Sequence, residues 1–134
     1  MITQTQEDYI RAVYLLKEKK GNDPSVSDIA KYLGLSRSTV WERLQTLVKN
    51  GLIDKESHLP VKLTEKGNKI ARRLIWKHRI IEVFLHQFLD LDLEQTYEEA
   101  HRLEHAFSDE SVKRLSQKLN NPAVCPHGYK ILHE

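Results

Sequence analysis

The stretch from Ser25 to Ile53, SVSDIAKYLGLSRSTVWERLQTLVKNGLI, constrains the fold more than any other part of the chain. It predicts two short helices, because Ser27 and Ser36 can each cap a helix start and Gly34 can end the first helix. The second helix stops before a further glycine, and its apolar side chains recur on one face. These are Val40, Leu44, Leu47 and Val48. Two short helices joined by a turn of about three or four residues with a glycine are the sequence form of a helix-turn-helix.

The segments on either side extend this pattern to a winged helix. Before it, QEDYIRAVYLLKEKK (residues 6–20) carries a helical stripe of apolar residues and is followed by Gly-Asn-Asp-Pro. After it, two short alternating runs, Leu52–Glu56 and Val61–Leu63, predict a small β-hairpin joined around His58 to Pro60. The order is therefore helix, helix-turn-helix, hairpin and helix.

The second half of the chain predicts helices only. Thr64 opens a long helix that DLDLEQ (residues 90–95) interrupts, and the next helix carries YEEAHRLEHAF (residues 97–107). Ser108 caps a further helix through Leu119, and the tail is loop-like. We therefore predict a mainly α fold: residues 1–71 form a winged helix-turn-helix domain with a β-hairpin wing, and residues 72–134 form an all-helical domain.

Composition narrows the class of protein. At 134 residues the chain makes one domain or two small ones. No apolar run reaches about 18 residues and the start does not resemble a signal peptide, so we expect no membrane association. Cys125 is the only cysteine, which leaves no intramolecular disulfide and favours a reducing cytoplasm. A net charge of +2 neither requires nor excludes a nucleic acid.

The helix-turn-helix predicts double-stranded DNA as a partner. The second helix of this motif enters the major groove, and its first residues meet base edges. Those residues here are Ser36, Arg37, Ser38, Thr39 and Glu42, while Lys55 and Lys62 flank the wing. Arg37 is the best base-reading candidate, because its guanidinium fork matches O6 and N7 of guanine. The alternative is that these are solvated polar residues on a helical domain of another purpose. Trp41 and Trp76 are interpreted as packing residues.

The helical half carries a candidate metal site. His101, Glu104 and His105 stand at i, i+3 and i+4, and His78 and Glu82 stand at i and i+4 on the preceding helix. Two antiparallel helices would bring the two sets together, and imidazole with carboxylate suits divalent manganese, iron, cobalt or zinc. Taken alone, H-x-x-E-H is also typical of a solvated helix surface. A metal-dependent enzyme could use the same ligands, but no further motif supplies a catalytic base.

Three stretches together resemble a known family. These are EDYIRAVYLL, KLTEKGNKIARRLIWKHRIIEVFL and EEAHRLEHAFSDE, found in order around the winged helix. They look like the diphtheria-toxin-repressor family, and the chain is similar in length to its short two-domain form. The resemblance implies a metal-activated, dimeric transcriptional repressor of metal-uptake genes with Mn²⁺ or Fe²⁺ as co-repressor, and with Zn²⁺ or Co²⁺ able to substitute in vitro. It implies a cytoplasmic protein that binds operator DNA, is not an enzyme and has no small organic substrate.

The resemblance also implies roles for particular residues. Asp8 falls where the family has a metal ligand on the first helix, and an aspartate there is similar to the manganese branch. Glu104 and His105 match ligands of both branches, whereas His101 matches neither. The expected main site is Asp8, His101, Glu104 and His105, with a neighbouring or shared site at His78 and Glu82. Arg11 stands where the manganese branch has a glutamate ligand, and Tyr97 replaces a histidine of the iron branch.

The helical half also predicts self-association. Its apolar side chains supply more surface than a domain of this size buries alone, which favours a symmetric homodimer. They are Phe84, Leu85, Phe88, Leu89, Leu103 and Phe107. Cys125 is interpreted as a bystander, and a ligand role for His127 is left open without being favoured. Two alternatives stay open: a winged-helix regulator that senses a non-metal ligand, and a small metal-dependent enzyme.

Overall fold

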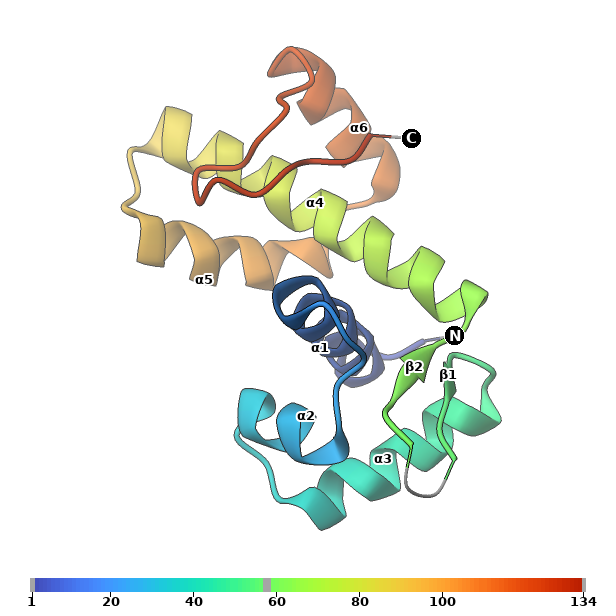
Figure 1. Ribbon diagram of the computed structural model, residues 1–134. Coiled ribbons are helices and arrows are strands. Elements are labelled where there is room, and N and C mark those ends of the chain that lie inside the picture. Colours follow the sequence, from blue (N-terminus) through green and yellow to red (C-terminus); the bar gives the residue numbers. More distant parts are fainter. Residues whose placement is uncertain (1, 57–58, 134) are drawn as a thin grey trace. The chain divides into compact units, whose positions relative to one another are not determined.

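A computed structural model describes residues 2–56 and 59–133 (Figure 1). The chain divides into two compact units, one through Arg72 and the other from Arg73 onward. The division falls inside the long helix α4, Glu65–Leu89. Within the described residues, no helix is both long enough and apolar enough to cross a membrane.

The first unit is a winged helix-turn-helix, which confirms the prediction. It contains α1 (Gln4–Lys20), α2 (Val26–Leu33) and α3 (Arg37–Lys49), followed by β1 (Ile53–Asp54) and β2 (Lys62–Leu63). The two strands pair antiparallel, with Ile53 opposite Leu63. Ser57 and His58, in the predicted hairpin turn, lie outside the described residues. One apolar core joins the helices to the wing; its fully buried members include Ile10, Ile29, Val40, Leu44, Leu47, Ile53 and Val61.

One predicted helix cap is wrong. The N-cap of α2 is Ser25 rather than Ser27: the Ser25 hydroxyl accepts a hydrogen bond from Asp28 N at 3.0 Å, and the Asp28 carboxylate accepts one from Ser25 N at 3.0 Å. This reciprocal capping box satisfies two backbone donors where a cap at Ser27 would satisfy one. The cap of α3 at Ser36 and the end of α2 at Gly34, in the left-handed conformation at φ 70°, are confirmed.

Gly67, near the start of α4, lies against the backbone of the wing. A Cβ at this position would stand 2.0 Å from the carbonyl oxygen of Leu52. Thr64 holds the same junction closed, because its backbone N–H donates to that oxygen at 3.1 Å and its hydroxyl donates to Gly51 O at 2.7 Å. Only glycine permits this approach between α4 and the residue before β1.

Gly67→Ala should therefore lower the free energy of unfolding by about 1–3 kcal/mol, the usual range for overpacking. This is the reverse of the gain of about 1 kcal/mol that alanine brings over glycine in an open helix. Urea denaturation followed by circular dichroism measures the change. The control is Lys66→Ala, an exposed neighbour in the same turn, which should change stability by only a few tenths of a kcal/mol. An unchanged Gly67→Ala midpoint would contradict the close packing.

The second unit is helical, with the rest of α4 followed by α5 (Leu93–Glu104) and α6 (Asp109–Lys118). Asp92 caps α5 in a capping box with Gln95, and Ser108 caps α6 as predicted. The tail after α6 forms a loop that also contributes to the core, since Cys125 and Ile131 are buried in the core of the second unit. The other buried core members are Ile80, Ile81, Leu85, Ala100 and Val112. The tail is thereby held against α4 and α5.

Candidate metal centre and DNA-binding surface

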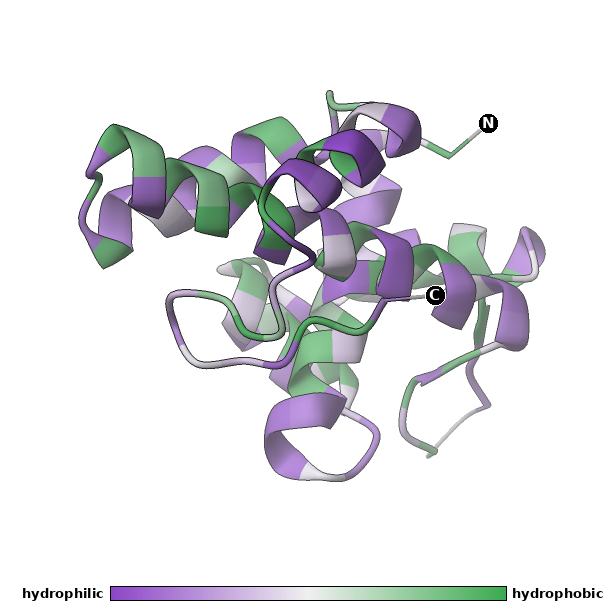
Figure 2. Ribbon diagram, turned by 90° about the horizontal axis from the view of Figure 1, so that it is seen from above, coloured by the Kyte–Doolittle hydropathy of each residue, from purple (hydrophilic) through white to green (hydrophobic). Residues whose placement is uncertain are grey.

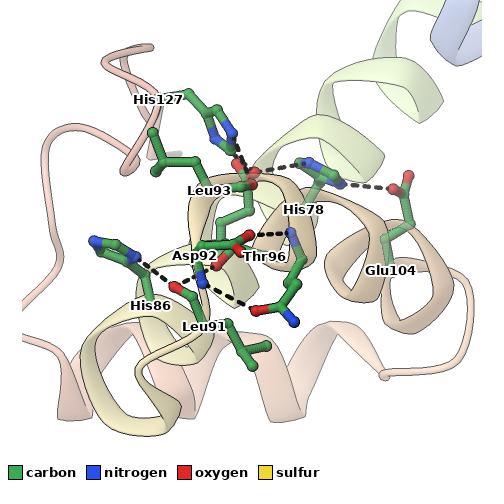
Figure 3. Close-up of polar contacts among 10 residues, drawn as sticks. His78, His86, Leu91, Asp92, Leu93, Thr96, Glu104 and His127 are labelled. Atoms are coloured by element: carbon green, nitrogen blue, oxygen red, sulfur yellow. Dashed lines mark hydrogen bonds and ion pairs between the residues drawn. The ribbon is translucent and has the colours of Figure 1, made fainter.

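A buried polar cluster lies between α4 and α5 in the second unit (Figure 3). His78 Nδ1 is 2.8 Å from Glu104 Oε1, and His78 Nε2 is 3.4 Å from Glu82 Oε2. The side chains of His78, Glu82 and Glu104 are 5%, 2% and 0% exposed. The two helices thus bring the predicted pair His78 and Glu82 together with Glu104, one of the three ligands predicted on the next helix. Burial of carboxylates at this depth is costly unless they are paired or bind a cation.

The tail adds a histidine to this cluster. His127 Nδ1 is 2.8 Å from Glu82 Oε2, while its Nε2 is 3.1 Å from the carbonyl oxygen of Leu93 (Figure 3). A carbonyl oxygen only accepts, so Nε2 carries a proton, and in the neutral ring Nδ1 presents its lone pair to the carboxylate. Two acceptor atoms at 2.8 Å need a cation between them, either a proton or a metal ion. The fixed tautomer is the arrangement typical of a metal-binding histidine.

Cys125 completes a set of possible ligands. Its Sγ, an Nδ1 or Nε2 of His127 and a carboxylate oxygen of Glu82 all lie within 4.8 Å of one another. Burial raises the pKa of the Cys125 thiol, opposed by backbone hydrogen bonds from residues of the same turn. Thiolate, imidazole and carboxylate together fit a divalent transition metal ion. The interpretation of Cys125 as a bystander missed this cluster, although Cys-Pro-His is a short sequence signal that could have indicated it.

Three other predicted ligands come from two different elements. His101 lies in the last turn of α5 and His105 is its C-cap residue; both are half-buried, and their ring centroids are 5.6 Å apart. The Tyr97 ring lies 5.0 Å from that of His78 and 6.1 Å from that of His127, so it lies beside the buried cluster. Asp8 is half-buried on α1 in the first unit. A site that joins Asp8 to His101, Glu104 and His105 therefore draws on both units and stays a prediction.

The predicted DNA-binding residues lie on the surface of the first unit. Ser36, Arg37, Ser38 and Glu42 are exposed at the start of α3, and Thr39 is half-buried. Arg37 Nη1 donates to the Ser27 hydroxyl at 3.2 Å. In the wing, Lys55 is half-buried and Lys62 is exposed. Trp41 is 41% exposed, so its interpretation as a packing residue is wrong, whereas Trp76 is half-buried against the core of the second unit.

A helix-turn-helix unit joined to a helical unit with a buried cluster of candidate metal ligands is typical of metal-dependent DNA-binding regulators. Comparison with known proteins agrees. Residues 1–59 match the N-terminal DNA-binding domain of iron-dependent repressors, and residues 64–133 match the metal-binding and dimerisation domain. The chain belongs to the iron-dependent repressor family and is a metal-dependent DNA-binding transcriptional regulator. This confirms the resemblance that the sequence indicated.

Individual relatives include both manganese and iron regulators. The chain is 37% identical over 115 residues to the helix-turn-helix transcriptional regulator MntR of Bacillus subtilis (86% of this chain, 80% of MntR). It is 35% identical over 130 residues to the iron-dependent repressor IdeR of Mycobacterium tuberculosis (97% of this chain, 56% of IdeR). The structure of the manganese regulator SloR superimposes with a TM-score of 0.83 at 39% identity, covering 95% of this chain and 59% of SloR. The chain thus spans less than two thirds of the last two.

Proposed function

We propose that this chain represses metal-uptake genes by binding operator DNA as a homodimer when Mn²⁺ or Fe²⁺ occupies its metal sites. The observation that carries the proposal is the buried cluster of carboxylate, imidazole and thiol groups in a chain that also carries a helix-turn-helix. Zn²⁺ and Co²⁺ suit the same ligands and should substitute in vitro.

Two metal sites are proposed for each subunit. The main site takes Asp8, His101, Glu104 and His105, which offer carboxylate and imidazole ligands. The second site takes Glu82, Cys125 and His127, whose ligand atoms lie within 4.8 Å of one another. His78 contacts both Glu82 and Glu104, so it couples the two sites through its ring nitrogens. A bound cation would supply positive charge to the buried carboxylates of Glu82 and Glu104, which the ring of His78 contacts.

The proposed mechanism uses the division of ligands between the two units. Asp8 belongs to the DNA-binding unit, and the other ligands of the main site belong to the helical unit. Ligands from both units that share one ion fix the angle between the units. In a dimer this angle sets the separation of the two recognition helices, which must match half-sites about 34–36 Å apart or a multiple of that distance. Because coupling is reciprocal, operator DNA should in turn tighten metal binding.

An exposed apolar surface supports the homodimer. Phe88, Leu89 and Leu93 are 59%, 54% and 45% exposed where α4 runs into α5, and the Phe84 ring lies 5.8 Å from that of Phe88. Figure 2 shows hydrophobic residues at this end of both helices. Contiguous exposed apolar side chains mark protein contact surfaces. The family's second domain is described as a dimerisation domain, which agrees with an isologous contact through these residues.

Fluorescence anisotropy tests the function directly, with labelled DNA from upstream of the protein's own gene and anaerobic Mn²⁺ or Fe²⁺, followed by chelator. We expect tight binding that chelator reverses and that scrambled DNA does not show. Equal binding with and without metal would favour a winged-helix regulator of another kind. Metal binding without DNA affinity in any metal state would favour the small metal-dependent enzyme.

The second site has a test of its own. Cys125→Ala and His127→Ala should each weaken binding of one Co²⁺ ion per chain by at least about tenfold, on the scale of losses at metal sites. Cys125→Ala should in addition remove the thiolate-to-cobalt absorption band. His133→Ala is the matched control, because His133 is an exposed tail histidine whose Nε2 donates to Pro122 O at 2.8 Å. Unchanged cobalt spectra in Cys125→Ala would contradict the site.

A further inference from the structure

Trp41 is a large aromatic residue that the fold leaves on the surface. It is 41% exposed, although α3 has a buried face formed by Val40, Leu44 and Leu47. Tryptophan is highly buried on average, and exposed aromatic side chains among polar neighbours are typical of contact surfaces. Packing of the first unit therefore does not explain why this position carries an indole.

The indole is supported from the wing. Lys55 Nζ lies 5.6 Å from the centroid of the Trp41 ring, a cation–π contact between β1's end and α3. Trp41 also lines an open groove of about 540 Å³ with Ser27, Arg37, Ser38, Lys55 and Leu59. Arg37 and Lys55 make this groove cationic, so its expected occupant is anionic. The contact with Lys55 restricts the indole before any ligand arrives, which lowers the entropy cost of binding.

Trp41 shares a helix face with the residues predicted to meet base edges. It stands four residues after Arg37 and three after Ser38, spacings that place side chains on one face of a helix. In a helix-turn-helix, that part of the recognition helix enters the major groove. The one apolar group that base pairs present in the major groove is the C5-methyl of thymine. The thymine methyl group is therefore the apolar contact that base edges provide for an indole in the major groove.

We propose that Trp41 is a specificity-determining residue that reads the C5-methyl group of a thymine in each operator half-site. The proposal rests on DNA binding by α3, as set out above, and adds a base preference to it. Lys55 contributes charge that is indifferent to sequence, and Arg37 keeps its expected contact with guanine, while the indole distinguishes thymine from cytosine, which lacks the methyl group. The wing thereby influences which base is recognised, because Lys55 contacts the Trp41 ring and restricts its position.

Substitution of uracil for thymine tests this contact, because it removes only the methyl group. After footprinting on the upstream DNA, each thymine in the protected half-sites is replaced by deoxyuridine, and affinities are measured by anisotropy. One thymine position should cost wild-type protein about fourfold per half-site, and on the order of tenfold when both half-sites are changed. Trp41→Ala should bind thymine DNA more weakly and show no loss with uracil. Trp41→Phe should retain part of the discrimination.

Controls separate this proposal from the proposed function. Tyr32→Ala removes an aromatic side chain of similar exposure, 42%, that does not line the groove, and it should leave uracil discrimination intact. If Trp41→Ala still bound thymine DNA more tightly than uracil DNA, the thymine contact would be wrong. The same conclusion would follow if the substitution lowered the affinity for both DNAs by the same factor. If the wild-type protein bound DNA equally with and without metal, only the proposed function would be contradicted. The uracil comparison would still test the contact of Trp41 with thymine.

A second readout does not depend on affinity. The chain has two tryptophans, so Trp76→Phe leaves Trp41 as the sole source of indole fluorescence. Operator DNA should shield Trp41 from acrylamide quenching, and DNA with uracil at the identified position should shield it less. Quenching that DNA leaves unchanged would show that the indole stays in solvent, and would overturn the proposal.

Discussion

Glu104→Gln is expected to abolish the metal response of operator binding, with a loss of metal affinity on the order of a hundredfold. Glutamine keeps the volume of the buried side chain, and its carbonyl oxygen can still accept from His78 Nδ1, which lies 2.8 Å from Glu104 Oε1. The substitution therefore removes a charge and a metal ligand while preserving the packing. Anisotropy with and without Mn²⁺, together with equilibrium dialysis, measures the effect.

The control for this substitution is Glu98→Gln, which makes the same chemical change at an exposed position on the same helix. It should leave metal affinity and the DNA response unchanged. Thermal unfolding of both variants without metal checks that the fold survives. If Glu104→Gln bound metal and DNA as wild type does, Glu104 would be a structural partner of His78 and no ligand.

Asp8→Ala should weaken metal-dependent DNA binding by at least about tenfold while changing the melting temperature little. Asp8 is the one ligand proposed from the DNA-binding unit, so its loss removes the link between that unit and the ion. Ligands on α5 remain, and metal should still bind, but it should no longer select the DNA-competent arrangement. Parallel titrations of metal binding and of operator binding separate the two effects.

Glu7→Ala is the matched control, since Glu7 is the neighbouring carboxylate and is also half-buried on α1. Its loss should cost a small amount of helix stability at most, because it lies in the first turn of α1. A metal response that survives Asp8→Ala intact would mean that the ion acts within the helical unit alone, and the bridging mechanism would be wrong.

The first unit was predictable because its signals are local. Gly34 and Ser36 fix the turn between α2 and α3 through their own backbone preferences, and the apolar period fixes which face of α3 is buried. The error at Ser27 is also local in origin. Two serines stand two residues apart, and the choice between them depends on the hydrogen bond that Ser25 N donates back to the Asp28 carboxylate.

The candidate metal centre was predictable only in part. Spacings within α4 and α5 indicated His78, Glu82 and Glu104, because helical periodicity relates residues three or four apart. Cys125 and His127 are more than forty positions from Glu82 along the chain, and no periodicity relates them to it. Their approach depends on the tail packing against α4, where Cys125 and Ile131 enter the core.

The sequence by itself determined the helix-turn-helix, the wing, the helical second half and the family, because caps, glycines and hydrophobic periods act over a few residues. Tertiary structure alone decided that His127 presents Nδ1 to Glu82, since its tautomer depends on the Leu93 carbonyl of another element. It also decided that Trp41 stays exposed under Lys55, because the position of the wing over α3 is set by the shared core. Contacts between distant segments depend on how helices and strands pack, and no pattern within a few residues of sequence indicates that packing.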